Sequence, residues 1–120
     1  MDSNRLKARF ADRSDFVICA ELTGGPGYSY APIEKFLQAW NEAGSSALPQ
    51  GFDFACITLP QNPGGLANIQ PADVLNHLVS RNLLGGLDVM PHVTCKDHNA
   101  YGITSLLVGH QHAGVETLLA

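Results

Sequence analysis

Polar side chains follow three apolar segments of the chain, at positions where a parallel sheet can hold a ligand. Glu21 comes directly after the run FVICA, and Thr58 ends a second run, FDFACI. His92 and Thr94 lie two residues apart in a third run, LDVMPHVT, and they point to one face because side chains alternate along a strand. Carboxyl, hydroxyl and imidazole groups gathered in this way can hydrogen-bond a ligand or exchange protons with it.

Glu21 is the candidate for catalysis. A carboxylate at the end of an apolar strand is costly to desolvate, so we expect burial to raise its pKa and to suit it for general acid catalysis near neutral pH. The alternative is a carboxylate that ends the strand in solvent or pairs with an arginine. His92 and Thr58 are candidate ligand-binding residues, although a single histidine in a strand is more often a satisfied core residue.

The histidines and cysteines do not predict a metal site. His92, Cys95 and His98 are close enough in sequence to suggest zinc, yet the first two point to opposite faces of a regular strand and no second pair completes the site. His110 and His112 lie about 200° apart around a helix, which indicates a solvated helix end. The loop LTGGPGYSYAP, with two tyrosines, either closes over a planar ligand by stacking or is an ordinary surface loop.

Three units of strand and helix must position these residues. Each unit has a short apolar run, a loop rich in glycine or proline, and a segment with apolar residues at helical spacing. The predicted strands cover residues 16–20, 52–57 and 87–93, the predicted helices follow from 32, 71 and 99, and a fourth strand begins at 117. The residues expected to face the core are Ile33, Phe36, Leu37 and Trp40 in the first helix, Val74, Leu75, Leu78 and Val79 in the second, and Ile103, Leu106 and Leu107 in the third.

The alternation of apolar strands with amphipathic helices indicates the α/β class, with a parallel sheet covered by helices. A doubly wound sheet and a (β/α)8 barrel both begin in this way, and both bind ligands at the carboxyl ends of their strands. Gly24, Gly25 and Gly27, after the first strand, do not form the GxGxxG pattern of a dinucleotide-binding sheet. The barrel is therefore favoured. Residues 1–120 are counted as one domain, because no linker-like segment divides them.

Composition excludes several classes of function. Of the 120 residues, 45% are hydrophobic and 15% are charged, which is typical of a globular domain. The net charge of −4 argues against a nucleic-acid partner, and no apolar run approaches the roughly 18 residues of a membrane span. The first residues lack the apolar core of a signal peptide, so we expect a cytoplasmic protein. Cys19, Cys56 and Cys95 are predicted to be reduced, buried thiols.

Four segments, taken in order, resemble a known family. They are AELT at 20–23, the strand end IT at 57–58, PHVTCKDHN at 91–99 and GVETLLA at 114–120. With this order and spacing the chain resembles the N-terminal part of the methylenetetrahydrofolate reductases. PHVTC followed by Asp97 is the most specific piece, and the resemblance extends over almost the whole chain from Phe16 onward.

The resemblance implies a (β/α)8 barrel that binds FAD and reduces 5,10-methylenetetrahydrofolate to 5-methyltetrahydrofolate, with NAD(P)H or another donor supplying the electrons. By that resemblance Glu21 is the general acid, which protonates a folate nitrogen as the imidazolidine ring opens. The resulting iminium carbon accepts hydride from the reduced flavin. Thr58 and His92 match positions that contact the flavin. The chain departs from the family's usual pattern at two places. Residues 24–26 are GGP where the family commonly has a proline pair, and Leu59 follows Thr58 where the family can have an aromatic or polar residue.

The length of the chain limits this expectation. A complete barrel takes about 250 residues, so 120 residues supply fewer than half of its units. We expect a fragment of a longer protein, or a sheet completed by another chain or a second copy, which in isolation binds FAD weakly and is inactive. Two other functions stay open. One is a non-catalytic, partner-dependent module, and the other is a related barrel enzyme acting on another pterin or small ligand.

Overall fold

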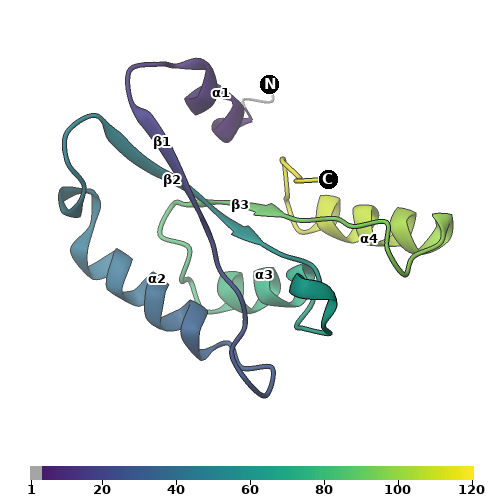
Figure 1. Cartoon of the computed structure of the whole chain (residues 1–120). Coiled ribbons are helices and arrows are strands. Elements are labelled where there is room, and N and C mark those ends of the chain that lie inside the picture. Colours follow the sequence, from purple (N-terminus) through teal and green to yellow (C-terminus); the bar gives the residue numbers. More distant parts are fainter. Residues whose placement is uncertain (1–3) are drawn as a thin grey trace.

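Strands and helices alternate along the chain (Figure 1). The structure, a computed structural model, describes residues 4–120. Its elements are α1 (Arg5–Ala11), β1 (Phe16–Glu21), α2 (Ala31–Ala43), β2 (Phe52–Leu59), α3 (Pro71–Ser80), β3 (Asp88–Pro91) and α4 (Ala100–His112), with 3-10 turns at Ser45–Ala47 and Pro63–Gly65. The three predicted strands and three predicted helices are present, and α1 is a further helix that the sequence analysis did not predict.

The strands form one parallel sheet in the order β1-β2-β3, which confirms the predicted α/β class. β1 pairs with β2 to its end, where Glu21 lies opposite Thr58. A register shift after Ile18 leaves Ala55 as an extra residue on β2. The outer edge of β1 has no neighbouring strand among residues 4–120. Because the strand order follows the chain order, successive strand ends lie side by side at one edge of the sheet.

The predicted fourth strand is present as a short parallel bridge. Leu119 pairs with His92, the N–H of Leu119 donates to the carbonyl of Pro91 at 3.0 Å, and the N–H of Val93 donates to the carbonyl of Leu119 at 2.8 Å. β3 itself ends at Pro91, two residues before its predicted end. The segment after α4 therefore lies beside the β3 edge of the sheet.

The helices α2 and α3 cover one face of the sheet (Figure 1). Ile33 and Leu37 of α2 and Leu78 of α3 share a single core with Ile57 and Leu59 of β2, and each of these side chains is at most 1% exposed. Burying a side chain of this size stabilises the fold by about 1.5–3 kcal/mol. This shared core holds both helices on the same side of the sheet.

The helix α1 lies on the opposite face of the sheet (Figure 1). Leu6 is 2% exposed and packs on Ala55 and Cys56 of β2. Asn4 caps the helix, since its side-chain oxygen accepts a hydrogen bond from the N–H of Lys7 at 2.8 Å. One apolar contact and one cap thus define a helix of seven residues, which has too short an apolar pattern to be recognised in the sequence.

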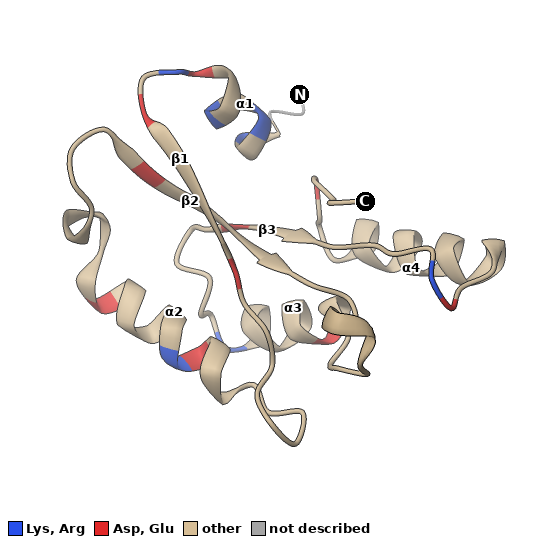
Figure 2. Ribbon diagram, in the orientation of Figure 1, with Lys and Arg blue, Asp and Glu red and all other residues tan. Residues whose placement is uncertain are grey.

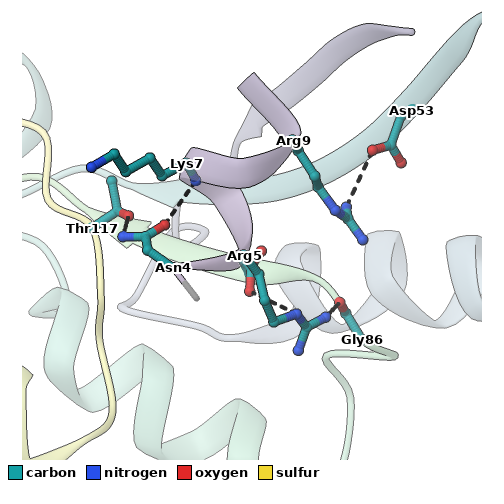
Figure 3. Close-up of polar contacts among 8 residues, drawn as sticks. Asn4, Arg5, Lys7, Arg9, Asp53, Gly86 and Thr117 are labelled. Carbon is teal, nitrogen blue, oxygen red and sulfur yellow. Dashed lines mark hydrogen bonds and ion pairs between the residues drawn. The ribbon is translucent and has the colours of Figure 1, made fainter. Parts of the chain in front are cut away.

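Polar contacts fasten α1 to distant parts of the chain (Figure 3). The N-cap amide donates to the hydroxyl of Thr117 at 3.0 Å, and Arg5 Nη2 donates to the carbonyl of Gly86 at 2.8 Å. Arg9 Nη1 lies 3.4 Å from Asp53 Oδ2. Exposed ion pairs of this kind contribute little, about 0–1 kcal/mol. The position of α1 therefore depends mainly on the burial of Leu6, described above.

Four helix residues differ from the sequence prediction. Phe36 of α2, Val79 of α3 and Leu107 of α4, all expected to face the core, are 40%, 56% and 37% exposed. His110, expected at a solvated helix end, is 1% exposed and is the buried residue of α4. The exposure of Leu107 follows from the position of α4, which extends outward past the end of β3, so that little of its length meets the sheet (Figure 1).

Charged residues are spread over the ribbon, and four of the seven Lys and Arg lie on α1 and the turn after it (Figure 2). Of these four, Arg5 lies 3.9 Å from Asp88 and Arg9 is paired with Asp53. The basic side chains near the amino end of the sheet are thus partly neutralised. Of the helices described within residues 4–120, none combines the length and the apolar character needed to cross a membrane.

Candidate functional site

The three predicted site residues lie on the face of the sheet that points away from α2 and α3. Glu21 and Thr58 are opposite each other near the ends of β1 and β2, and His92 directly follows β3. Ile57 and Leu59 pack in the core under the helices, so Thr58 between them points to the other face. The carboxyl ends of three neighbouring strands therefore present the three predicted side chains together.

Glu21 and His92 approach each other across β2. Oε2 of Glu21 lies 3.9 Å from Nε2 of His92, which is too far for a hydrogen bond and close enough for attraction when the imidazole is protonated. The Nε2 atom of His92 is buried and has no hydrogen-bond partner within residues 4–120. A buried polar atom left unpaired costs about 1–3 kcal/mol. His92 therefore offers a hydrogen-bonding position that a ligand can fill.

The surroundings of Glu21 differ from the sequence prediction. Its side chain is 55% exposed, so the burial expected after an apolar strand is absent. Thr58, on the central strand, is only 7% exposed. The difference arises because β1 is at the edge of the sheet and, among residues 4–120, no helix covers this end of the open face (Figure 1). Glu21 is a solvent-facing carboxylate, and a ligand or further protein must cover it before it can act as a desolvated acid.

The other half of the same face is covered and apolar. Cys19 and Cys56 are opposite each other on β1 and β2, beneath α1. Burial raises the pKa of the Cys56 thiol to about 12 and also raises the pKa of Cys19, so both thiols are protonated at neutral pH. All three cysteines are free thiols. The prediction of burial is wrong for Cys95, which is exposed in the loop after β3.

Two cavities open beyond the carboxyl ends of β2 and β3. One, of about 410 Å³, lies between His92 and the segment after α4. The other, of about 380 Å³, includes Asn62 and Lys96 in its wall. Gln61 and Thr94 line both cavities. The ends of these two strands therefore form the concave part of the site region.

Thr94, predicted to bind a ligand beside His92, is held by the loops. Its N–H donates to Gln61 Oε1 at 2.9 Å, and its hydroxyl oxygen accepts a hydrogen bond from the N–H of Lys96 at 3.1 Å. The hydroxyl thus closes a turn, and its hydrogen can still be donated to a ligand. Thr94 lines the site but is also part of the scaffold that shapes it.

The tyrosine-containing loop after β1 does not close over the site. Tyr30 is stacked on His77 of α3, with ring centroids 3.9 Å apart and an interplanar angle of 5°. His77 in turn lies 2.7 Å from Glu34 of α2. Tyr28, at the tip of the loop, is 63% exposed. Of the two alternatives from the sequence, the geometry favours a surface loop, which Tyr30 fastens to the helical side of the molecule.

Sequence reasoning missed the role of Gln61, which is 7% exposed and contacts three other residues of the site loops. His98, considered only as a possible zinc ligand, lies 3.0 Å from Gln61 Nε2. Within residues 4–120 no three metal-ligating side chains come together in a way that could hold a metal ion. The available signal for Gln61 was its place two residues after a buried strand, where a polar side chain is costly unless it is paired.

Comparison with known proteins does not identify a relative. Searches against protein-family models, curated protein sequences and solved structures give no match to this chain. A functional assignment therefore depends on the site residues, on their geometry and on the motifs that they belong to.

Proposed function

We propose that this chain forms the first β–α units of a (β/α)8 barrel that binds FAD and reduces 5,10-methylenetetrahydrofolate to 5-methyltetrahydrofolate. The observation that carries the proposal is the common position of Glu21, Thr58 and His92, the residues that match the acid and flavin-binding positions of the family that the sequence resembles. They lie at the carboxyl ends of three neighbouring parallel strands, on one face. Barrels bind their ligands at that end.

The strand order supports a barrel. β1, β2 and β3 follow one another in chain order, and Leu119 continues the series beside His92. Both crossover helices, α2 and α3, pack in one core on the same face of the sheet. A doubly wound sheet reverses its strand order and carries helices on both faces. α1 lies on the opposite face, but it precedes β1 and connects no two strands.

His92 and Thr58 fit a flavin. The unpaired, buried Nε2 of His92 and the hydroxyl of Thr58 are polar groups next to apolar strand surface, a combination suited to the polar edge of a planar ring system. When bound, FAD supplies the hydride, which it receives from NAD(P)H or another donor. The cavity of about 410 Å³ beside His92 gives room for part of the ligand.

Glu21 is the proposed general acid. Its carboxyl group donates a proton to a folate nitrogen as a C–N bond of the imidazolidine ring breaks, and the carbon that remains as an iminium accepts the hydride. Exclusion of water raises the pKa of a carboxyl group, so that the group can hold its proton near neutral pH. Glu21 is 55% exposed without ligands, so folate packed over this face must provide the exclusion.

Ligand binding tests the position of the site. We would follow backbone amide NMR shifts of the chain while adding millimolar FAD, because binding by these units alone is expected to be weak. The largest shifts should occur at Glu21, Thr58 and His92, at the carboxyl ends of the strands. Phe16 and Asp88, at the amino ends, serve as internal controls. Shifts centred on those two residues, or no shifts at all, would contradict the proposal.

Substitution of the acid tests the chemistry. With the remaining barrel units supplied, Glu21→Gln should lower folate reduction at least 100-fold, while reduction of FAD by its electron donor continues at the original rate. The matched control is Glu42→Gln, which changes an exposed carboxylate on α2. Folate turnover that persists in Glu21→Gln would show that the acid is wrongly assigned.

A second candidate is a non-catalytic module that acts through a partner. The outer edge of β1, which has no neighbouring strand within residues 4–120, favours it, because such an edge can accept another strand. In that case Glu21→Gln would leave function unchanged, and a partner would co-purify with the chain. A related barrel enzyme acting on another pterin would instead keep its dependence on Glu21, and a panel of reduced pterins would reveal the preferred substrate.

A further inference from the structure

Gln61 is a buried amide between the loops that follow β2 and β3. Its side chain is polar yet only 7% of the residue is exposed. Oε1 accepts a hydrogen bond from the N–H of Thr94 at 2.9 Å, and Nε2 donates to Gln70 Oε1 at 3.2 Å. Nε2 also lies 3.0 Å from Nε2 of His98. An amide has one acceptor oxygen and two N–H donors, so these three contacts use all of its groups.

The contacts allow one orientation of the Gln61 amide. The backbone N–H of Thr94 can only donate, so it must face Oε1, and the NH₂ group must then face Gln70 and His98. His98 must accept through a lone pair on Nε2. The imidazole is therefore neutral in this arrangement, with its proton on Nδ1, which is the less common tautomer of a histidine in water.

The network continues to the start of the loop after β2. Gln70 Nε2 donates to Asn62 Oδ1 at 3.4 Å, and the same oxygen accepts a hydrogen bond from the N–H of Asn68 at 3.3 Å. Donors and acceptors alternate in one direction from Thr94 through Gln61 and Gln70 to Asn62. Such a network is fully satisfied only as a unit, and removing one member leaves other buried groups unpaired.

The Gln61–Thr94 hydrogen bond lies in the wall shared by the two site cavities. Thr94 is two residues from His92, the proposed flavin contact, and the Gln61 amide joins the loop after β3 to the loop after β2 both here and at His98. The charged residues in the wall beside His98 are Lys96 and Asp97, which pair with each other at 3.9 Å.

We propose that Gln61 is a positioning residue of this site. Its amide joins the loops after β2 and β3, sets the place of His92 and Thr94 relative to Thr58, and holds His98 as a neutral acceptor with its proton on Nδ1. Gln61 itself touches no reacting atom. The part of this inference that concerns flavin binding rests on the proposed function. The hydrogen-bond network around Gln61 can be tested without a ligand.

The tautomer of His98 and the protection of Thr94 give the first test. In the unaltered chain at pH 8, ring nitrogen NMR shifts should show a protonated Nδ1 and an unprotonated Nε2 in His98. In Gln61→Met, which keeps the length but loses the hydrogen bonds, the Thr94 amide should exchange about tenfold faster and the His98 tautomer should revert. Gln38→Met, an exposed change on α2, should alter neither.

Gln61→Glu separates a hydrogen-bonding role from a space-filling one. The carboxylate can accept a hydrogen bond from the N–H of Thr94 and another from Nε2–H of the neutral His98 ring, which then carries its proton on Nε2 instead of Nδ1, while Gln70 turns its amide to donate. At pH 8 the Thr94 amide should therefore stay as protected in Gln61→Glu as in the unaltered chain, while ring nitrogen NMR shifts show that the His98 proton has moved from Nδ1 to Nε2. A His98 proton that stays on Nδ1 in Gln61→Glu would overturn the proposal, even if Gln61→Met failed to fold.

FAD titration distinguishes this inference from the proposed function. If FAD shifts His92 in the unaltered chain and Gln61→Met reduces its affinity at least fivefold, both stand. Unchanged FAD affinity in Gln61→Met would overturn the positioning role and leave the flavin assignment intact. If FAD shifts nothing in the unaltered chain, the flavin assignment fails. The His98 tautomer is then the remaining test of the Gln61 hydrogen-bond network, and a proton on Nε2 of His98 at pH 8 would overturn the network.

Discussion

The open face of the sheet has two halves that differ in cover and in chemistry. At the amino ends of the strands, Leu6 of α1 packs on Cys56, and burial raises the pKa of that thiol to about 12, so it is inert. At the carboxyl ends, Glu21 is exposed and His92 has an unpaired ring nitrogen. The same three strands supply both halves. A helix of seven residues therefore decides which half is core and which half can bind a ligand.

Removing the cover should have the largest effect on this difference. Leu6→Ala deletes a side chain that is 2% exposed, and such a change costs about 2–4 kcal/mol in the free energy of unfolding, through lost burial and the cavity left behind. Urea denaturation measures the loss. Because Cys56 lies directly beneath, its thiol should also become reactive toward a maleimide under native conditions.

The matched control for that change is Leu66→Ala, which truncates a leucine that is 74% exposed. It should change the free energy of unfolding by less than about 0.5 kcal/mol and leave Cys56 unreactive. If Leu6→Ala behaved like Leu66→Ala, α1 would not be the cover of this half of the face, and the contrast between the halves would need another cause.

The two halves also differ in what their sequence could predict. The neighbouring positions of Glu21, Thr58 and His92 were predictable from the sequence, because each lies at the end of an apolar run and a parallel sheet brings such ends together. The exposure of Glu21 was not, since burial at an edge strand depends on what packs beside it. Leu6 gave no signal either, because a single apolar residue in a short segment has no periodicity to detect.

The hydrogen-bond network of the site loops shows the same limit. Gln61 contacts residues that are 9, 37 and 33 positions away, namely Gln70, His98 and Thr94. No local pattern connects such positions, and only the parallel register brings the loops after β2 and β3 together. Short segments of sequence thus predict which polar side chains lie at the strand ends, whereas the contacts that hold those side chains in place depend on the tertiary structure.

A smaller effect is expected from His110, whose backbone accepts a hydrogen bond from Val115 in the segment that lines the amino end of the sheet. Burial lowers the pKa of His110 below its ordinary value of 6.5. The unfolded chain therefore binds the proton more readily than the folded chain. His110 has no effect of this kind on the free energy of unfolding above about pH 6.5, and it lowers that free energy as the pH falls from 6.5 toward the pKa of His110 in the folded chain.

His110→Leu should remove that dependence. The difference in unfolding free energy between His110→Leu and the unaltered chain should widen in favour of the variant as the pH is lowered from 7.5, as measured by urea denaturation at several pH values. Gln111→Leu, an exposed neighbour that does not titrate, controls for the added apolar side chain. A difference that stayed constant with pH would show that burial does not lower the pKa of His110 in the folded chain.

The smallest change in stability is expected at the open half, from Thr58→Val. Valine has nearly the shape of threonine and keeps its packing on β2, so the free energy of unfolding should stay within about 1 kcal/mol of its original value. The hydroxyl that it removes is one of the two groups proposed to bind FAD, so the affinity for FAD should fall while stability is retained. Loss of stability comparable to Leu6→Ala, with FAD affinity unchanged, would make Thr58 a core residue. Of the three predicted site residues, only Glu21 and His92 would then belong to the open half of the face.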